Sequence, residues 1–127
     1  MSNSRLDALL VSLEQALKRL DAALARPADE YIRDSCIQRF EFTYELIWKA
    51  LKVHLEERGV EVYAPKDTLR EAFRAGLIGE DRLWLETVTL RNLAAHTYSE
   101  STAEEIYRAL PPIARRYREL FDKLRAR

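Results

Sequence analysis

The hydrophobic residues of this chain recur every three or four positions, which is the spacing of amphipathic helices, and no stretch alternates as a β-strand would. In the first segment this spacing predicts one apolar stripe on a helix that ends near Arg26 and Pro27. The members of this stripe are Leu6, Leu10, Leu13, Leu17, Leu20 and Leu24.

A second and longer helix is expected from about Asp29 to Arg58, with Gly59 as its C-terminal cap. Two apolar stripes follow this segment, so we expect neighbours to cover it on two sides and place it at the centre of the fold. The first stripe comprises Ile37, Phe40, Tyr44, Ile47, Leu51 and Leu55, and the second comprises Phe42, Leu46, Ala50 and Val53.

Two shorter helices are expected in the middle of the chain. The first runs from Pro65, a residue suited to an opening helical turn, to about Ala75, where Gly76 can stop it. The next begins near Glu80 and continues through the polar residues considered below.

The last helix is expected to begin at Ser101 or Thr102, because Thr102 and Glu105 have the spacing of a capping box. Pro111 and Pro112 should kink or divide it. Its apolar stripe comprises Ile106, Leu110, Ile113, Tyr117, Leu120 and Leu124.

These elements predict an all-α protein. Short connections between long helices favour antiparallel neighbours, so we expect an up-and-down antiparallel four-helix bundle with one additional short helix. The length of 127 residues suits a single helical-bundle domain over residues 1–127, with a core that needs no staple.

Composition narrows the function classes. The 21 basic and 21 acidic residues cancel, so no global field draws the chain to nucleic acid or membrane, although a local basic patch is not excluded. Cys36 stands alone, which excludes an internal disulfide framework. Charges interrupt the apolar residues of the N-terminus, and no segment has the length of a membrane span. We expect a cytoplasmic protein with no membrane partner.

The stretch LRNLAAHTYSE, residues 90–100, places polar side chains at the end of a helix that is apolar nearly all round and should therefore be buried. A buried arginine must meet a carboxylate, an anion or an interface, because burying an unpaired charge is costly. Arg91 and His96 lie five residues apart, about 140° around a helix. They converge only if the helix unwinds near Ala95 or if two copies meet.

The chemistry of this set suits RNA. The planar cation of Arg91 matches phosphate, and His96 can move protons near neutral pH. Together they can cleave RNA without a metal: the histidine activates the 2′-hydroxyl or protonates the leaving oxygen, while the arginine stabilises the charged transition state. Asn92 can orient either group. On the residues alone, a structural arginine and histidine are the more frequent explanation.

Other candidate residues have a structural explanation beside the functional one. Trp84, Tyr44 and Trp48 could stack on a base, but aromatics at helical spacing are usually core, and Trp84 is the best candidate for a nucleotide or RNA contact. The two histidines, His54 and His96, lack metal-ligand spacing, and no glycine-rich phosphate loop occurs. We therefore predict no metal site and no cofactor.

The C-terminal segment RRYRELFDKLRAR is locally basic. Its cations could contact RNA phosphates, but a solvated face interleaved with Glu119 and Asp122 is the more frequent explanation. These cations are Arg115, Arg116, Arg118, Lys123, Arg125 and Arg127.

The run from Arg91 to Tyr98 has the form Arg-x4-His-x-Tyr with Asn92 after the arginine, and it resembles the signature of the HEPN superfamily. The blocks FEFTYELIWKALKVHLEERG, APKDTLREAFRAGLI and WLETVTLRNLAAHTYSE are similar to its nucleotidyltransferase substrate-binding subfamily, also described as HepT-like. The resemblance covers roughly residues 36–107.

This resemblance implies a homodimeric bundle that pairs with a minimal nucleotidyltransferase encoded nearby. In one view of the family the protein is a ribonuclease toxin, with Arg91 and His96 catalytic, Asn92 beside them, and Tyr98 the residue to which the partner transfers AMP. In the alternative view it is a non-catalytic nucleotide- or substrate-binding subunit. The first view makes the chain an enzyme and is the one we favour.

The chain departs from the family pattern at one position. Relatives often carry an acidic residue just before the motif arginine, where this chain has Leu90. Glu86 or Glu100 could supply the missing carboxylate instead.

Overall fold

The computed structural model describes residues 4–96 and 99–127, and the structure in these ranges is five α-helices without a strand. The helices are α1 (Ser4–Leu24), α2 (Glu30–Glu57), α3 (Pro65–Arg74), α4 (Arg82–His96) and α5 (Glu100–Ala126). The predicted fold class, an all-α bundle with one additional short helix, is confirmed.

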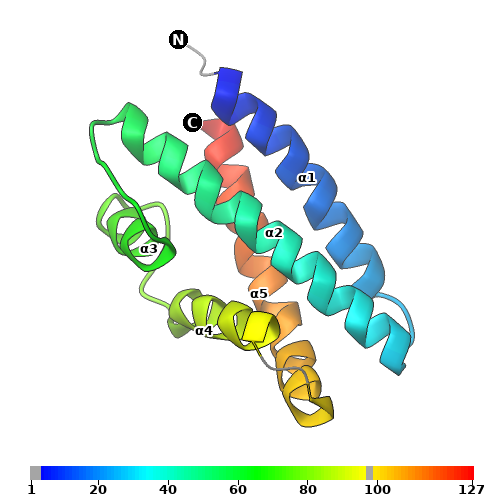
Figure 1. The fold of residues 1–127 in the computed structure, drawn as a ribbon. Coiled ribbons are helices and arrows are strands. Elements are labelled where there is room, and N and C mark those ends of the chain that lie inside the picture. The colour runs from blue at the N-terminus through cyan, green and yellow to red at the C-terminus, as the bar shows by residue number, and fades with distance from the viewer. Residues whose placement is uncertain (1–3, 97–98) are drawn as a thin grey trace.

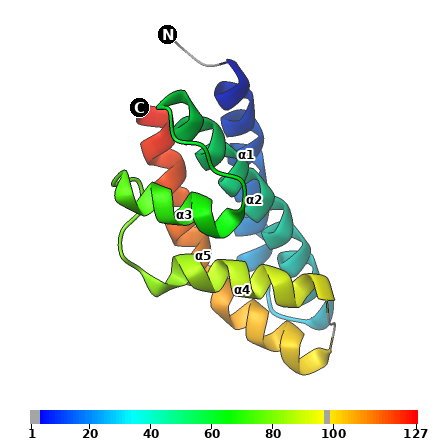
Figure 2. The ribbon, with the colours of Figure 1, turned by 60° about the vertical axis from the view of Figure 1, so that its left-hand side comes forward.

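The helix α2 occupies the centre of the bundle and contacts the other four helices. Figure 1 shows α1 and α2 as an antiparallel pair, with α5 running behind them in the direction of α2. The shorter α3 and α4 lie on the side of α2 that faces away from α1 (Figure 1). In both views α4 crosses α5 obliquely (Figures 1 and 2). No helix in the described ranges is both long enough and apolar enough to cross a bilayer.

The expected ends of α2 are confirmed. Asp29 caps its N-terminus, with Oδ1 accepting a hydrogen bond of 2.7 Å from the backbone N–H of Ile32. Arg58 ends the helix, and Gly59 follows with φ of 81°, a conformation that glycine adopts without steric cost. Gly76 adopts the same conformation after α3, with φ of 78°.

The expected start of α5 was wrong. Ser99 is the N-cap, and its Oγ accepts a hydrogen bond of 3.2 Å from the N–H of Thr102, which is already helical. Serine and threonine both suit the N-cap position, and here the earlier of the two takes it. Pro111 and Pro112 do not divide α5, because the apolar residues on both sides of them are buried in one core, and tertiary packing dominates helix stability.

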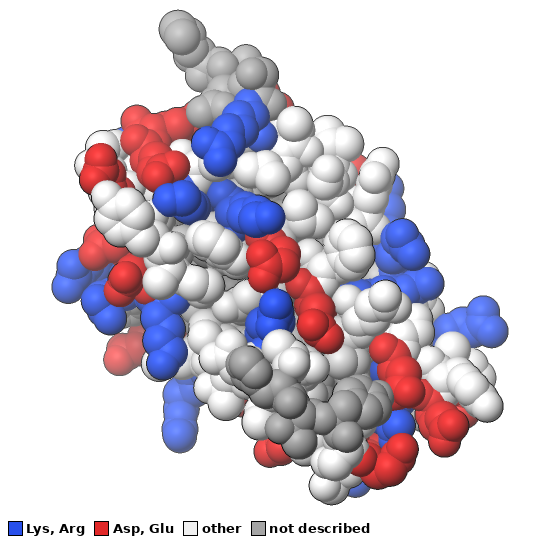
Figure 3. Space-filling model, viewed as in Figure 1, with Lys and Arg blue, Asp and Glu red and all other residues white. Residues whose placement is uncertain are grey.

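The second apolar stripe of α2 is only partly covered. Ala50 and Val53 are buried, but Leu46 is half-buried and the side chain of Phe42 is 68% exposed. Opposite Phe42, α1 presents small and polar residues that leave a surface hollow instead of packing against the ring. Figure 3 shows the corresponding uncharged band over α1 and α2. The expectation that neighbours cover this stripe was therefore wrong at Phe42.

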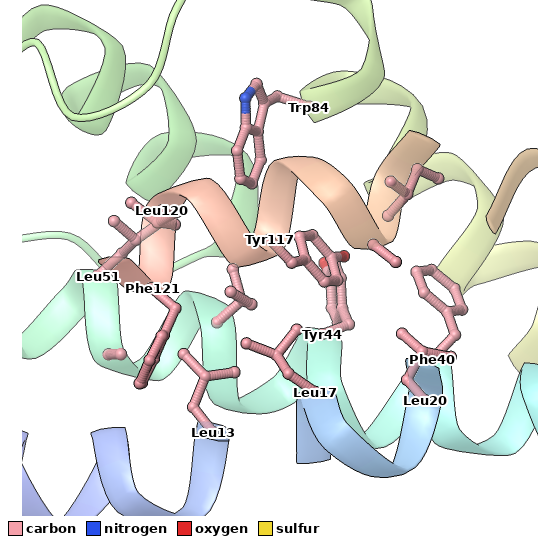
Figure 4. Close-up of a cluster of buried hydrophobic side chains, with 14 of the residues drawn as sticks. Leu13, Leu17, Leu20, Phe40, Tyr44, Leu51, Trp84, Tyr117, Leu120 and Phe121 are labelled. Atoms are coloured by element: carbon pink, nitrogen blue, oxygen red, sulfur yellow. The ribbon is translucent and has the colours of Figure 1, made fainter. Parts of the chain in front are cut away.

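Tyr117 of α5 is the centre of the buried core (Figure 4). Its ring stacks on Phe40 of α2 with centroids 6.5 Å apart, and it lies 5.8 Å from Trp84 of α4. Its hydroxyl forms a buried hydrogen bond with the hydroxyl of Thr87. A single side chain thus ties α4, α2 and α5 together and fixes how α4 lies on the bundle.

The basic C-terminal segment is held largely by carboxylates. Along the contact between the antiparallel α1 and α5, three carboxylates at seven-residue spacing each contact an arginine of α5. The pairs are Asp7–Arg127 (2.7 Å), Glu14–Arg125 (3.8 Å) and Asp21–Arg118 (2.7 Å). We refer to these three pairs as the α1–α5 ladder.

Candidate functional site

The start of α4 is fixed by Asp81. Its Oδ1 accepts a hydrogen bond of 3.0 Å from the N–H of Leu83, and its Oδ2 accepts one of 2.6 Å from Nε of Arg116. The Arg116 guanidinium, followed by the Leu83 N–H, holds the pKa of the Asp81 carboxyl below its usual value. With Thr87 bonded to Tyr117 one turn further on, α4 presents its C-terminal half in a defined position.

The helix α4 is buried on one side only, so the expectation of complete burial was wrong. Trp84, Val88 and Leu90 pack into the core, whereas Leu85 is 62% exposed and Asn92 is exposed. Within the described residues nothing covers the side that carries Leu85 and Asn92. The uncovered side is mostly polar, with Arg82, Glu86 and Thr89 also exposed, and Leu85 is its one large apolar residue among those described.

Arg91 points from α4 toward α2. Its Nη2 lies 3.8 Å from Oε1 of Glu45, and the other oxygen of Glu45 accepts a hydrogen bond of 3.2 Å from the indole N–H of Trp48. The sequence left a carboxylate, an anion or an interface open as the partner of Arg91, and among the described residues Glu45 is the nearby carboxylate. The sequence suggested Glu86 or Glu100 as that carboxylate, but Glu86 is exposed and Glu100 is bound elsewhere.

The guanidinium of Arg91 has an unused donor. The Nε atom is buried and has no hydrogen-bond partner among the described residues. The 3.8 Å contact between Arg91 and Glu45 is too long to be a hydrogen bond. The side chain of Arg91 as a whole is 27% exposed. A buried donor left unpaired costs roughly 1–3 kcal/mol. Because Nε itself is buried, an oxyanion would have to approach the part of the guanidinium that remains exposed.

Arg33 joins the beginnings of α2 and α5. This buried arginine contacts Glu100 at 2.7 Å, Asp34 at 3.1 Å and Glu104 at 3.3 Å. The bond to Glu100 is the main cause that raises the pKa of Arg33 above its usual value. The first turn of α5, directly after the motif, is thus fixed to α2.

Sequence reasoning missed both Arg33 and Glu45. Arg33 lies four residues before Ile37 and continues the core stripe of α2, so a charged residue at a core position was the available signal. Glu45 carried no such signal, because its role follows from where α4 crosses α2.

Leu90, directly before the motif arginine, is buried in the core. A carboxylate in that apolar environment would be costly to ionise. The carboxylate beside Arg91 comes instead from Glu45 on α2.

Trp84 packs in the core, with 5% of its surface exposed, and one edge of the ring borders a small hollow beside Asp81 and Arg116. Its contact with nucleotide or RNA stays a prediction, and the packing on Tyr117 favours the structural explanation. Among the described residues, no group of three His, Cys, Asp or Glu side chains could hold a metal ion.

The structure brings Arg91 and Glu45 together and leaves Asn92 exposed on the same turn of α4. The backbone of α4 ends at His96. The side chain of His96 and the whole of Tyr98 lie outside the described residues, so their roles stay predictions.

The fold and the motif-bearing helix define a HEPN-type helical bundle. The model of the family described as "Nucleotidyltransferase substrate binding protein like" matches residues 4–127, and the chain belongs to this HepT-like family. The resemblance seen in the sequence is thereby confirmed.

Relatives of known name or structure cover nearly the whole chain. A protein of Haemophilus influenzae (strain Rd) named probable ribonuclease HepT is 33% identical over 132 residues, covering 96% of this chain and 90% of the relative. A crystal structure from Thermus thermophilus matches with a TM-score of 0.84 at 39% identity, over 89% of this chain and 98% of that one. A structure from Haemophilus influenzae, described as the substrate-binding domain of a nucleotidyltransferase, matches with a TM-score of 0.69 at 32% identity, over 96% and 98%.

Proposed function

We propose that this protein is a metal-independent endoribonuclease toxin that pairs with a minimal nucleotidyltransferase as its antitoxin. The observation that carries the proposal is the guanidinium of Arg91, which is held near Glu45 at 3.8 Å while its buried Nε lacks a partner among the described residues. Such a guanidinium can donate hydrogen bonds to a phosphate oxygen. The relative named probable ribonuclease HepT supports the same activity.

The reaction follows from the chemistry of the motif. The 2′-oxygen of the ribose forms a bond to the adjacent phosphorus, and the bond from phosphorus to the 5′-oxygen breaks. The products are a 2′,3′-cyclic phosphate and a free 5′-hydroxyl. His96 accepts the proton of the 2′-hydroxyl or supplies one to the leaving oxygen, and Arg91 stabilises the negative charge on the phosphoryl oxygens. Asn92 orients the substrate or His96.

A homodimer supplies what one copy lacks. Arg91 and His96 lie about 140° apart on an ideal helix, so one copy does not aim both at one phosphate. The exposed Leu85 on the same helix is an apolar contact point for a second copy. Two copies joined through α4 bring the arginine of one toward the histidine of the other and supply both an acid and a base.

The cleavage experiment compares single substitutions on α4. His96→Ala and Arg91→Lys should each lower RNA cleavage by at least about 100-fold with the melting temperature unchanged, because each removes a group that acts in the transition state. Arg82→Gln is the matched control, since Arg82 is exposed on the same helix and has no ion pair in the described structure. A folded His96→Ala variant that cleaves RNA at the wild-type rate would exclude the proposed catalysis.

The regulatory part of the proposal concerns Tyr98. The partner would join the phenolic oxygen of Tyr98 to the α-phosphorus of ATP and release pyrophosphate. Intact mass of the protein co-expressed with the transferase should show one or more added AMP groups, and Tyr98→Phe should remove them. If modified and unmodified protein cleave RNA equally, AMP transfer is not the mode of neutralisation.

A second candidate function is a non-catalytic subunit that holds the substrate of the transferase. Leu90 in place of an acid favours it, as does the description of the family and of the Haemophilus structure as substrate-binding. It predicts a complex with the transferase and nucleotide affinity by calorimetry, with no RNA cleavage in any form of the protein.

A further inference from the structure

Two neighbouring hollows run along the contact between α1 and α2, and Ser12 lines both of them. The first, of about 450 Å³, includes Arg19, Arg39 and Phe42 among its lining residues. Arg5, Trp48, Lys49 and Lys52 belong to the second, of about 390 Å³. We call these two hollows together the α1–α2 groove.

The groove gathers positive charge in a chain whose net charge is zero. Five cations line it, two in the first hollow and three in the second, and no Asp or Glu lines either. Lys52 is paired with Glu56 outside the groove at 2.9 Å, but Arg19, Arg39 and Lys49 contact no carboxylate among the described residues. Figure 3 shows the uncharged band over α1 and α2 with basic side chains near both of its ends. A surface of this charge can attract a polyanion.

The other residues of the groove suit a nucleic acid with unpaired bases. Phe42 presents an aromatic ring that is 68% exposed beside the cations, and base stacking on such rings is a common device for binding single strands. Hydroxyl and amide side chains, from Ser12, Gln15 and Gln38, supply partners for sugar and base edges.

The groove is connected to the candidate active site through one side chain. Trp48 lines the second hollow, and its indole N–H binds Glu45, the residue that contacts Arg91. Trp48 thus links the groove to Glu45, and Glu45 links it to Arg91.

We propose that the α1–α2 groove binds single-stranded RNA, with Arg19, Arg39 and Lys49 on the phosphates and Phe42 stacked on a base. The groove then selects unpaired RNA and carries it toward Arg91. This inference rests on the proposed ribonuclease function for its ligand class, but binding can be measured without cleavage.

The test is fluorescence anisotropy with a labelled single-stranded RNA, using the full chain with His96→Ala so that the probe stays intact. Adding Arg19→Gln and Arg39→Gln should weaken binding on the order of 20-fold at 0.1 M salt, because two phosphate contacts are lost. The slope of log affinity against log salt should become shallower by about 1.4. The matched control carries Arg108→Gln and Arg115→Gln, two exposed arginines of α5 without an ion pair in the described structure, and should bind as the parent does.

A further variant separates stacking from charge. Phe42→Ala should weaken binding about 5-fold or more while leaving the salt slope unchanged, because a stacked ring releases no counterions. A duplex of the same sequence should bind less tightly than the single strand.

Several outcomes would overturn the inference. Equal affinity of the parent and the Arg19/Arg39 variant would exclude the groove, as would a parent that binds no RNA. If the same substitutions leave RNA binding intact but dissociate the homodimer, or a complex with the transferase, a protein occupies the groove. RNA that binds through the groove but is never cleaved by wild-type protein supports the groove and rejects only the proposed catalysis.

Discussion

The two flanks of α1 carry opposite charge: one carries carboxylates that contact arginines of α5, and the other lines a groove with arginines and no carboxylate. On the side of α5, acidic residues meet the arginines of the α1–α5 ladder. On the side of α2, Arg5, Ser12 and Arg19 line a groove without a carboxylate. The segment that looks basic in the sequence is largely neutralised in the structure, whereas Arg19, Arg39 and Lys49 on α1 and α2 contact no carboxylate among the described residues. A local excess of arginine therefore says little until its neighbours are known.

The α1–α5 ladder fixes the register of α5 along α1 more than it stabilises the fold. Its side chains remain partly exposed, and surface ion pairs are typically worth about 0–1 kcal/mol each because solvent screens them. Three pairs along one helix contact nevertheless disfavour a shift of α5 along α1, since a shift would separate the arginines from their carboxylates.

Placing a carboxylate in the α1–α2 groove should have the largest effect on the difference in charge between the two flanks of α1. Ser12→Glu adds a negative charge where the two hollows meet and should lower affinity for single-stranded RNA about 10-fold at low salt, because the added carboxylate repels the phosphates. Ser12 is exposed, so the melting temperature should stay within a few degrees. Val11→Glu adds the same charge one position away, outside the groove, and should change RNA affinity much less. Equal losses in the two variants would show that only net charge matters.

The reverse change removes the carboxylates of the α1–α5 ladder and so breaks its three ion pairs. Asp7→Asn, Glu14→Gln and Asp21→Asn together should lower the free energy of unfolding by about 1–2 kcal/mol, the sum of three screened pairs. They should also create a weak, salt-sensitive affinity for RNA along α5, since the arginines lose their partners. Urea denaturation and anisotropy measure the two effects. A variant that gains RNA binding without losing stability would mean that the pairs only mask the arginines.

Exchanging the charges of one ladder pair, Asp21 and Arg118, should have a smaller effect and tests whether that pair interacts through charge. Arg118→Asp and Asp21→Arg should each destabilise the protein, and the double variant should recover most of the loss. The coupling free energy should be about 0.3–1 kcal/mol at low ionic strength. It should fall in 1 M NaCl, where screening acts within about 3 Å. A coupling that does not depend on salt would point to packing and not to charge.

Asp81 gives the smallest effect and tests another paired arginine of α5. Arg116 lowers the pKa of Asp81 in the folded protein, so the ionised carboxyl stabilises the fold above the unfolded value of about 3.9. That contribution is lost as pH falls below 4 through the lower folded pKa. Wild type should therefore be more stable than Asp81→Asn at pH 7, and melting curves between pH 7 and pH 2 should converge at the acid end. A constant difference across this range would exclude ionisation as the cause.

Much of the fold could be predicted because it depends on spacing along the chain. The leucine stripe of α1, the central position of α2 and the stops at Gly59 and Gly76 all follow from local rules. The predictions for Phe42 and for the prolines of α5 were wrong because contacts between distant segments decide the structure there. Phe42 is exposed because α1 is small and polar opposite it, and the prolines of α5 are tolerated because the core holds both halves of that helix.

The candidate site was predictable in its residue types but not in its partners. The pattern around Arg91 pointed to a carboxylate or an anion, yet Glu45 lies 46 positions earlier in the sequence and reaches Arg91 only because α4 crosses α2. The same holds for Arg33, whose partners Glu100 and Glu104 are supplied by α5. Long-range pairs of this kind leave no periodic signal in the chain.

The division of α1 into three lengthwise stripes has a consequence for how the protein can evolve. Leucines hold the core, carboxylates set the register with α5, and the third stripe faces the groove. Because these duties fall on different residues, substitutions in the third stripe can change what the surface recognises without disturbing the fold. Related proteins can therefore drift from one ligand to another by exchanging a few solvent-facing positions of a single helix.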